Sequence, residues 1–195
     1  MGKVVPYRPP RAREEATARI GMVIFLASWA MLFAALLLAY AFVRARSEAW
    51  PPPGLTRLPR LLPLANTVVL ALSSACLEYG LREVRRARAQ VLEHSLLATF
   101  VLGVLFLGLQ ALLWGVLARG GLRLDSGAYA SVFYGLTWIH ALHVAVGLVG
   151  LVRMARGAMA GEYNAVWHLP VRLWAMYWHF VGVVWVVMFV SIFLV

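Results

Sequence analysis

The chain has 195 residues, of which 63% are hydrophobic and only 13% are charged. Soluble domains are about half apolar and about one quarter charged, so this composition excludes an ordinary soluble domain and indicates an integral membrane protein. The formal net charge of +10 would suggest nucleic acid in a soluble protein. Here the basic residues lie in short loops between apolar runs, which indicates membrane orientation and no nucleic-acid partner.

Residues 1–18 are polar, basic and proline-bearing, and we expect a cytoplasmic tail there. The first apolar run covers about 20–43, which exceeds the roughly 20 residues that cross a bilayer as a helix. The segment 47–62 contains four prolines. Because proline removes a backbone donor and fixes φ, this segment predicts a turn-rich loop. The second run, about 63–81, is the shortest and most polar span.

Three further apolar runs follow at about 94–117, 128–152 and 172–195. We therefore predict an all-α, polytopic membrane protein in which residues 19–195 form one bundle of five transmembrane helices. The single cysteine, Cys76, lies within the second run and allows neither an internal disulfide nor a thiolate metal cluster.

The basic residues fall unequally on the two sides of the membrane, because successive spans alternate in direction. One side collects Lys3, Arg8, Arg11, Arg13, Arg19, Arg82, Arg85, Arg86, Arg88, Arg153, Arg156 and Arg172. The other side collects Arg44, Arg46, Arg57, Arg60, Arg119 and Arg123. The excess on the first side predicts a cytoplasmic N-terminus and a C-terminus on the outer side.

Polar side chains within apolar spans are candidates for function, because hydrocarbon makes them costly. The fourth span carries His140 and His143, which lie on one helix face because they are three residues apart. The fifth span carries Trp178 and His179 about two turns from its start, and the third span carries Gln110.

Three interpretations of these side chains are open at this point: hydrogen bonding between packed helices, ligation of a b-type haem, and a proton-relay or lipid-headgroup role. A haem site needs histidines at matched depth on two helices. His140 and His143 share one helix, and His179 lies near the inner end of its own. No two histidines are therefore clearly placed to face one another across a haem. Gly147 and Gly150 predict a closely packed neighbouring helix.

The few carboxylates point away from proton transfer. Glu78 lies near the inner end of the second span, four residues before Arg82, and this spacing favours an ion pair over a catalytic role. The spans contain no aspartate. A subunit that pumps protons by itself would carry a chain of carboxylates through the membrane.

Five motifs occur in a fixed order from residue 19 onward. They are Arg19-x-Gly21-Met22-x-x-Phe25-x-x-Ser28, then Trp50-Pro51-Pro52-x-Gly54 with Pro63, Asn66-Thr67 and Ser73-Ser74, then Leu109-Gln110-Ala111, then His140-Ala141-Leu142-His143-Val144-x-x-Gly147, and finally Tyr177-Trp178-His179-Phe180-Val181 with Trp185 and Phe189-Val190-Ser191-Ile192. In this order they resemble subunit III of haem–copper terminal oxidases, in its short five-helix form.

The chain departs from that family's pattern at three positions. Trp29 stands where seven-helix members carry a membrane-buried glutamate, Gly182 where the family has an aspartate, and Leu113 where it has a further glutamate. Each replacement removes an intramembrane carboxylate. The proton-antenna roles proposed for the family are therefore not expected here.

The resemblance implies a non-catalytic subunit III of a respiratory oxidase, most simply of the cytochrome c type, in a bacterial inner membrane. Its partners would be the catalytic subunit I and subunit II, which would hold the haem and copper, while this chain would carry neither and would bind phospholipid. The expected interior polar cluster is Gln110, His140, His143, Trp178 and His179, and the expected lipid-headgroup residues are Arg19 and Arg172.

Two alternatives remain beside this expectation. One is an accessory five-helix subunit of a nitric oxide reductase or of a quinol oxidase. The other, from a different class, is an independent b-type haem membrane protein.

Overall fold

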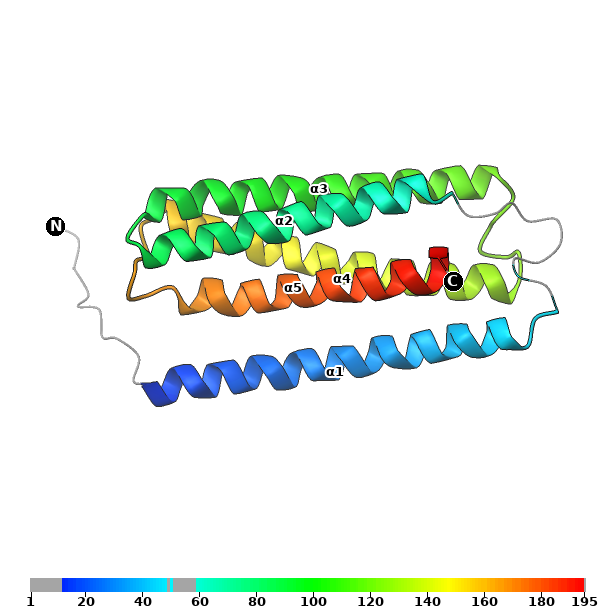
Figure 1. Ribbon diagram of the computed structural model, residues 1–195, viewed down its shortest axis with the longest axis horizontal. Coiled ribbons are helices and arrows are strands. Elements are labelled where there is room, and N and C mark those ends of the chain that lie inside the picture. The colour runs from blue at the N-terminus through cyan, green and yellow to red at the C-terminus, as the bar shows by residue number, and fades with distance from the viewer. Residues whose placement is uncertain (1–11, 49, 51–58, 195) are drawn as a thin grey trace.

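The computed structural model describes residues 12–48, 50 and 59–194. The described residues form five long helices and no strand (Figure 1). The helices are α1 (Ala12–Ala45), α2 (Leu61–Arg85), α3 (Ala89–Arg119), α4 (Ala128–Met159) and α5 (Leu169–Phe189), which a π-helical turn, η1 (Val190–Leu194), extends. All five are long and apolar enough to cross a membrane, so the predicted all-α fold with five spans is confirmed. Most of the expected N-terminal tail and of the proline-rich loop lies outside the described residues.

Helices α1 to α4 are longer than the apolar runs that predicted them. α1 begins at Ala12, inside the expected tail, and α4 continues to Met159, seven residues past the predicted end of its span. The 34 residues of α1 extend for about 50 Å, whereas the hydrocarbon core is about 30 Å thick. Hydropathy marks only the part of a helix inside hydrocarbon, and the backbone hydrogen bonds continue beyond it.

Helices α2 to α5 form a four-helix bundle, and α1 lies along one side of it (Figure 1). α2 makes its most extensive contacts with α3, and α1 packs on α4 and α5. In the most apolar stretch of α1 only 6% of the residues are buried, against 50% in α4 and in α5. α1 is therefore a peripheral helix whose surface mostly faces outward from the chain.

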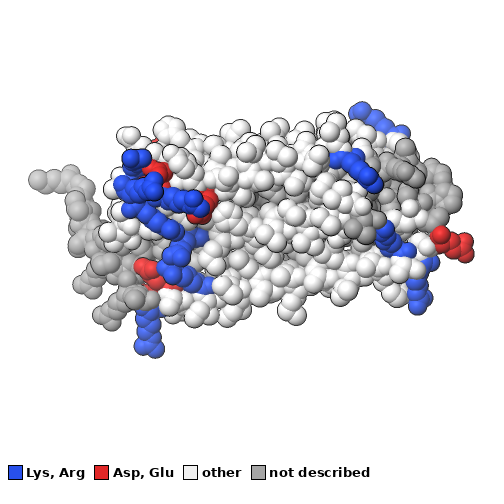
Figure 2. Space-filling view, viewed as in Figure 1, with Lys and Arg blue, Asp and Glu red and all other residues white. Residues whose placement is uncertain are grey.

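Charged side chains gather at the two ends of the molecule and leave an uncharged middle in the face that Figure 2 shows. The larger group of arginines lies at the end that carries the α2–α3 turn, 86–88, and the α4–α5 connector, 160–168. We call this the basic end. The uncharged middle is the surface that a bilayer requires.

Candidate functional site

Trp178 is fully buried at the centre of the four-helix bundle. Its Nε1–H donates a hydrogen bond to Ser73 Oγ on α2 at 3.0 Å. Two glycines leave room for the indole: a Cβ added at Gly103 on α3 would lie 2.8 Å from it, and one added at Gly147 on α4 would lie 2.7 Å from it. A single side chain of α5 thus joins α2, α3 and α4.

Gly147 and Gly150 of α4 admit α5 as their close neighbour, as the sequence predicted. A Cβ added at Gly150 would collide with the indole of Trp174. The Nε1–H of Trp174 donates to the Gly147 carbonyl at 3.0 Å. The Tyr177 hydroxyl donates to the His143 carbonyl at 2.9 Å. Three aromatic side chains of α5, those of Trp174, Tyr177 and Trp178, therefore fix its position on α4.

Gln110 is buried on α3 and faces α2. Its Oε1 accepts a hydrogen bond from Asn66 Nδ2 at 3.1 Å. Asn66, Ser73 and Gly80 recur at every seventh position of α2, and each contacts α3. Two turns of an α-helix take about seven residues, so these small and polar residues form one stripe along the α2–α3 interface. The spacing was present in the sequence and is the signal that could have identified Asn66.

His140 and His143 lie on the side of α4 that meets α1 and α5. His140 is 1% exposed, and its ring lies among those of Phe106 and Trp185, with centroids 5.9 Å and 5.4 Å away. His143 Nδ1 lies 2.7 Å from the Ile139 carbonyl oxygen, which makes the ring part of the hydrogen bonding of its own helix.

The sequence did not indicate that Trp29 of α1 packs on His143. The two ring centroids are 4.1 Å apart and the planes meet at 84°. Phe33 lies next to both histidines. We call the site formed by Trp29, Phe33, His140 and His143 the α1–α4 seam. Trp29 Nε1, both ring nitrogens of His140 and His143 Nε2 are buried without a hydrogen-bond partner among the described residues. A buried polar group without a partner costs about 1–3 kcal/mol.

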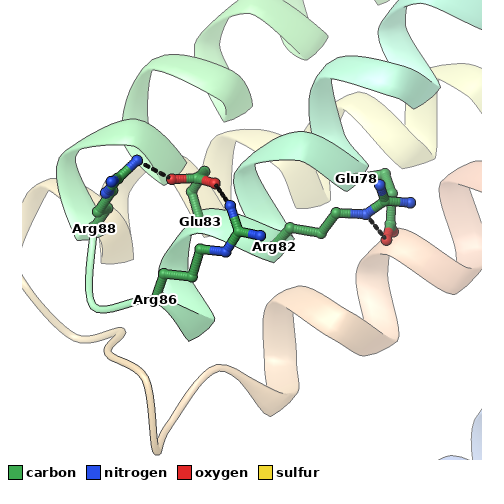
Figure 3. A network of polar contacts seen from close by, with 5 residues as sticks. All are labelled: Glu78, Arg82, Glu83, Arg86 and Arg88. Atoms are coloured by element: carbon green, nitrogen blue, oxygen red, sulfur yellow. Dashed lines mark hydrogen bonds and ion pairs between the residues drawn. The ribbon is translucent and has the colours of Figure 1, made fainter.

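His179 lies apart from these side chains. Its side chain is 38% exposed, and its Nε2 lies 3.8 Å from Glu78 Oε2. The other carboxylate oxygen of Glu78 accepts from Arg82 Nε at 3.0 Å, which confirms the predicted i, i+4 ion pair (Figure 3). His179 therefore belongs to a half-exposed charged group between α2 and α5, near the basic end.

A buried carboxylate, which the sequence analysis had not identified, organises the α2–α3 turn. The side chain of Glu83 is 3% exposed and accepts from Arg86 Nη1 and from Arg88 Nη1, each at 2.9 Å (Figure 3). The Arg88 backbone N–H donates to the Glu83 carbonyl at 3.0 Å. Ala87 adopts a left-handed φ of 62°, which lets the chain reverse after α2.

The two arginines expected at lipid headgroups have different surroundings. Arg19 forms an ion pair with Glu15 at 3.1 Å. Arg172 has no ion pair among the described residues, and it lies near His168, whose other cationic neighbour is Arg85. Partial burial lowers the pKa of His168 below its ordinary value of 6.5, and the two arginines lower it further, whereas a hydrogen bond with the Asn164 backbone raises it.

The three positions at which the resemblance implies carboxylates hold no ionisable side chain in this chain. Leu113 is fully buried in the core, and Trp29 lies in the α1–α4 seam. Gly182 lines an open groove between α2 and α5, close to Ser74 and His179. The groove has a volume of about 350 Å³ and an almost entirely apolar lining.

The five residues expected to form one interior polar cluster do not do so. Gln110 pairs with α2, Trp178 lies between α2, α3 and α4, and the two histidines of α4 lie in the α1–α4 seam. His179 is 38% exposed and lies beside Glu78 of α2. The described residues include no group of three or more His, Cys, Asp or Glu placed to hold a metal ion.

Comparison with known proteins identifies relatives along almost the whole chain. A family model for cytochrome c oxidase subunit III matches residues 13–195. The chain is 32% identical over 176 residues to cytochrome c oxidase subunit 3 of Thermostichus vulcanus. This match covers 90% of this chain and 86% of that protein. It is 35% identical to the Synechocystis sp. subunit 3, over 89% of this chain and 74% of the relative. It is 29% identical to the probable subunit 3 of Nocardia farcinica, over 100% of this chain and 96% of the relative.

Proposed function

The chain belongs to the cytochrome c oxidase subunit III family, and from this premise we propose that it braces the catalytic subunit of the oxidase without carrying out catalysis itself. The match over residues 13–195 is the observation that carries the proposal. The relatives from Thermostichus vulcanus and Synechocystis sp. are each named as subunit 3 of cytochrome c oxidase.

The use of the interior polar groups supports a bracing role. Asn66, Ser73 and Gln110 hydrogen-bond across helix interfaces, and the indole of Trp178 fills the centre of the bundle. The carboxylates of Glu78 and Glu83 lie near the basic end and are paired with arginines. The amide, hydroxyl and indole groups thus hold helices together, and the carboxylates hold arginines at the basic end.

The exposure of α1 leaves a surface to which a protein partner can bind. Only 6% of its most apolar stretch is buried, so most of that helix is free to contact lipid or another membrane subunit. The partners we propose are the catalytic subunit I and subunit II, which would hold the haem and copper. The proposed location is a bacterial inner membrane, with the basic end in the cytoplasm because basic loops remain on that side.

Bound phospholipid is the second part of the proposal. Arg172 lies at the basic end, at the start of α5, and is a suitable partner for a lipid phosphate. Arg19 is a weaker candidate, because its guanidinium already pairs with Glu15. The apolar groove between α2 and α5 offers a surface for hydrocarbon.

The test is gentle solubilisation of membranes that contain the tagged chain, followed by native mass spectrometry. The expected result is one complex that contains this chain, the catalytic subunit, subunit II and phospholipid. A chain recovered without oxidase subunits would overturn the proposal. So would a reduced-minus-oxidised haem spectrum in the separated chain at one haem per chain, which would favour the independent b-type cytochrome.

A further inference from the structure

The α1–α4 seam joins polar side chains from two helices near the middle of each. The rings of Trp29 and His143 are in edge-to-face contact, with centroids 4.1 Å apart. Phe33 closes the site beside both histidines, with centroids 6.1 Å from His140 and 5.1 Å from His143. The seam is thus enclosed by aromatic rings, although it contains several hydrogen-bonding nitrogens.

The hydrogen-bonding roles of Trp29 and His143 follow from their neighbours. The carbonyl oxygen of Ile139 can only accept, so His143 Nδ1, which lies 2.7 Å away, carries the hydrogen. In the neutral imidazole, Nε2 is then an acceptor. The indole Nε1 of Trp29 is a donor only. Both atoms are buried and have no hydrogen-bond partner in the described part of the chain, so an unused donor and an unused acceptor lie in the same seam.

His140 adds one further unused donor and one further unused acceptor. Its ring is 1% exposed, and neither of its nitrogens has a partner among the described residues. A neutral imidazole has one N–H and one lone pair. The indole N–H of the adjacent Trp185 cannot satisfy the lone pair, because it donates to Thr67 Oγ1 at 3.0 Å.

Buried polar groups in native proteins are nearly always paired, with protein or with ordered water. Water supplies two donors and two acceptors, the same kinds of group that the seam leaves unused. We propose that an ordered water molecule is buried in the α1–α4 seam. It accepts a hydrogen bond from Trp29 Nε1 and donates one to His143 Nε2, and it lies within the same enclosed site as His140.

The first test is a map of the intact oxidase complex at a resolution that shows ordered water. The expected result is a density peak about 2.7–3.2 Å from both Trp29 Nε1 and His143 Nε2. A direct N–H···N hydrogen bond between the two rings, or a seam without density, would overturn the proposal.

The second test uses infrared spectra of the complex in ordinary water and in water labelled with oxygen-18. A buried water gives an O–H stretching band that shifts with the isotope. This band should disappear in Trp29→Phe, which removes the donor, and remain in Trp138→Phe, whose side chain is 50% exposed on α4. An identical band in both variants would contradict the assignment. If Trp29→Phe does not assemble, the wild-type map alone decides.

Discussion

A single missing atom at Gly147 sets how closely α4 and α5 approach. Its missing Cβ leaves the space that the six-membered ring of Trp178 occupies, and Trp178 has no exposed surface into which it could move. The same indole also lies against Gly103 on the opposite helix. A shift of the ring away from α4 would therefore press it into α3.

The substitution Gly147→Ala should destabilise the chain by about 1–3 kcal/mol, the range typical of overpacking in a filled core. Gly135→Ala is the matched control on the same helix, because nothing lies within 4 Å of the added Cβ. The control should be neutral or slightly stabilising, since alanine is the better helix former. Thermal unfolding of the two variants in detergent measures the difference, and equal midpoints would contradict the packing argument.

His168 predicts how stability depends on pH at the basic end. Burial first, and then Arg85 and Arg172, lower the pKa of its imidazole in the folded chain below 6.5. The unfolded chain therefore binds this proton more readily, so folding stability is full above pH 6.5 and decreases as the pH falls below that value. His168→Gln should flatten this acid-side decrease in the unfolding midpoint between pH 7.5 and 5.5. A slope equal to that of the wild type would rule out His168 as a source of the acid-side decrease in stability.

The sequence predicted the burial of Gln110, His140, His143 and Trp178, but not their partners. A polar residue in an apolar span indicates that the residue faces protein, because facing lipid is costly. It does not indicate which helix lies opposite, since that depends on how each helix is rotated about its axis. His179 is polar and lies in an apolar span, but it is not buried. Its position near the end of a span allowed it to pair with Glu78 at a half-exposed site.

Few side chains attach α1 to the other helices. Phe33 and Tyr40 are each 3% exposed, whereas most of the large apolar side chains around them face outward. Hydrocarbon solvates an apolar helix as well as protein does, so only close packing and hydrogen bonds hold α1 in place.

Phe33→Ala should weaken the docking of α1 by about 3 kcal/mol or more, because it removes a ring packed on both histidines of α4. Met31→Ala is the control, since Met31 is 74% exposed on the same helix. Hydrogen-exchange mass spectrometry should show faster exchange in α1 of the first variant, with α2 to α5 unchanged. The same exchange in both variants would show that Phe33 does not secure the helix.

The α2–α3 turn depends on the charge of Glu83. Glu83→Gln keeps the shape of the side chain and weakens its contacts with Arg86 and Arg88, so we expect a loss of about 1–3 kcal/mol. Trypsin should then cleave after these arginines several times faster. Glu93→Gln, which changes a carboxylate without an ion pair among the described residues, should leave the cleavage rate unchanged. Equal rates in the two variants would contradict the role of Glu83.

The elements themselves were predicted well, and their ends were not. Each apolar run corresponds to one helix, because a span must satisfy its own backbone hydrogen bonds in hydrocarbon. Hydropathy carries no signal for the polar turns that continue a helix into the headgroup region. α1 therefore begins earlier and α4 ends later than their apolar runs indicate. The buried Glu83 was missed for the same reason, because a carboxylate in a basic loop resembles a surface residue.

For the whole molecule, the unequal charge of its two ends predicts how it lies in the membrane. The arginines of the 86–88 turn should face the cytoplasm, and the 120–127 connector should face outward. In a Cys76→Ala background, Ser126→Cys should react with a membrane-impermeant maleimide in intact spheroplasts. Gln90→Cys, at the start of α3, should react only after permeabilisation. The reverse pattern would invert the assigned topology.

The arrangement of α1 has a consequence for biogenesis. α1 precedes the other described helices in the chain, but the helices on which it packs, α4 and α5, follow all the others. A ribosome delivers α1 to the translocon long before its binding surface exists. Phe33 and Trp29 must therefore wait in lipid, or beside an insertase, while the hairpin of α2 and α3 assembles first. Closure of the α1–α4 seam therefore has to follow the synthesis of α4 and α5.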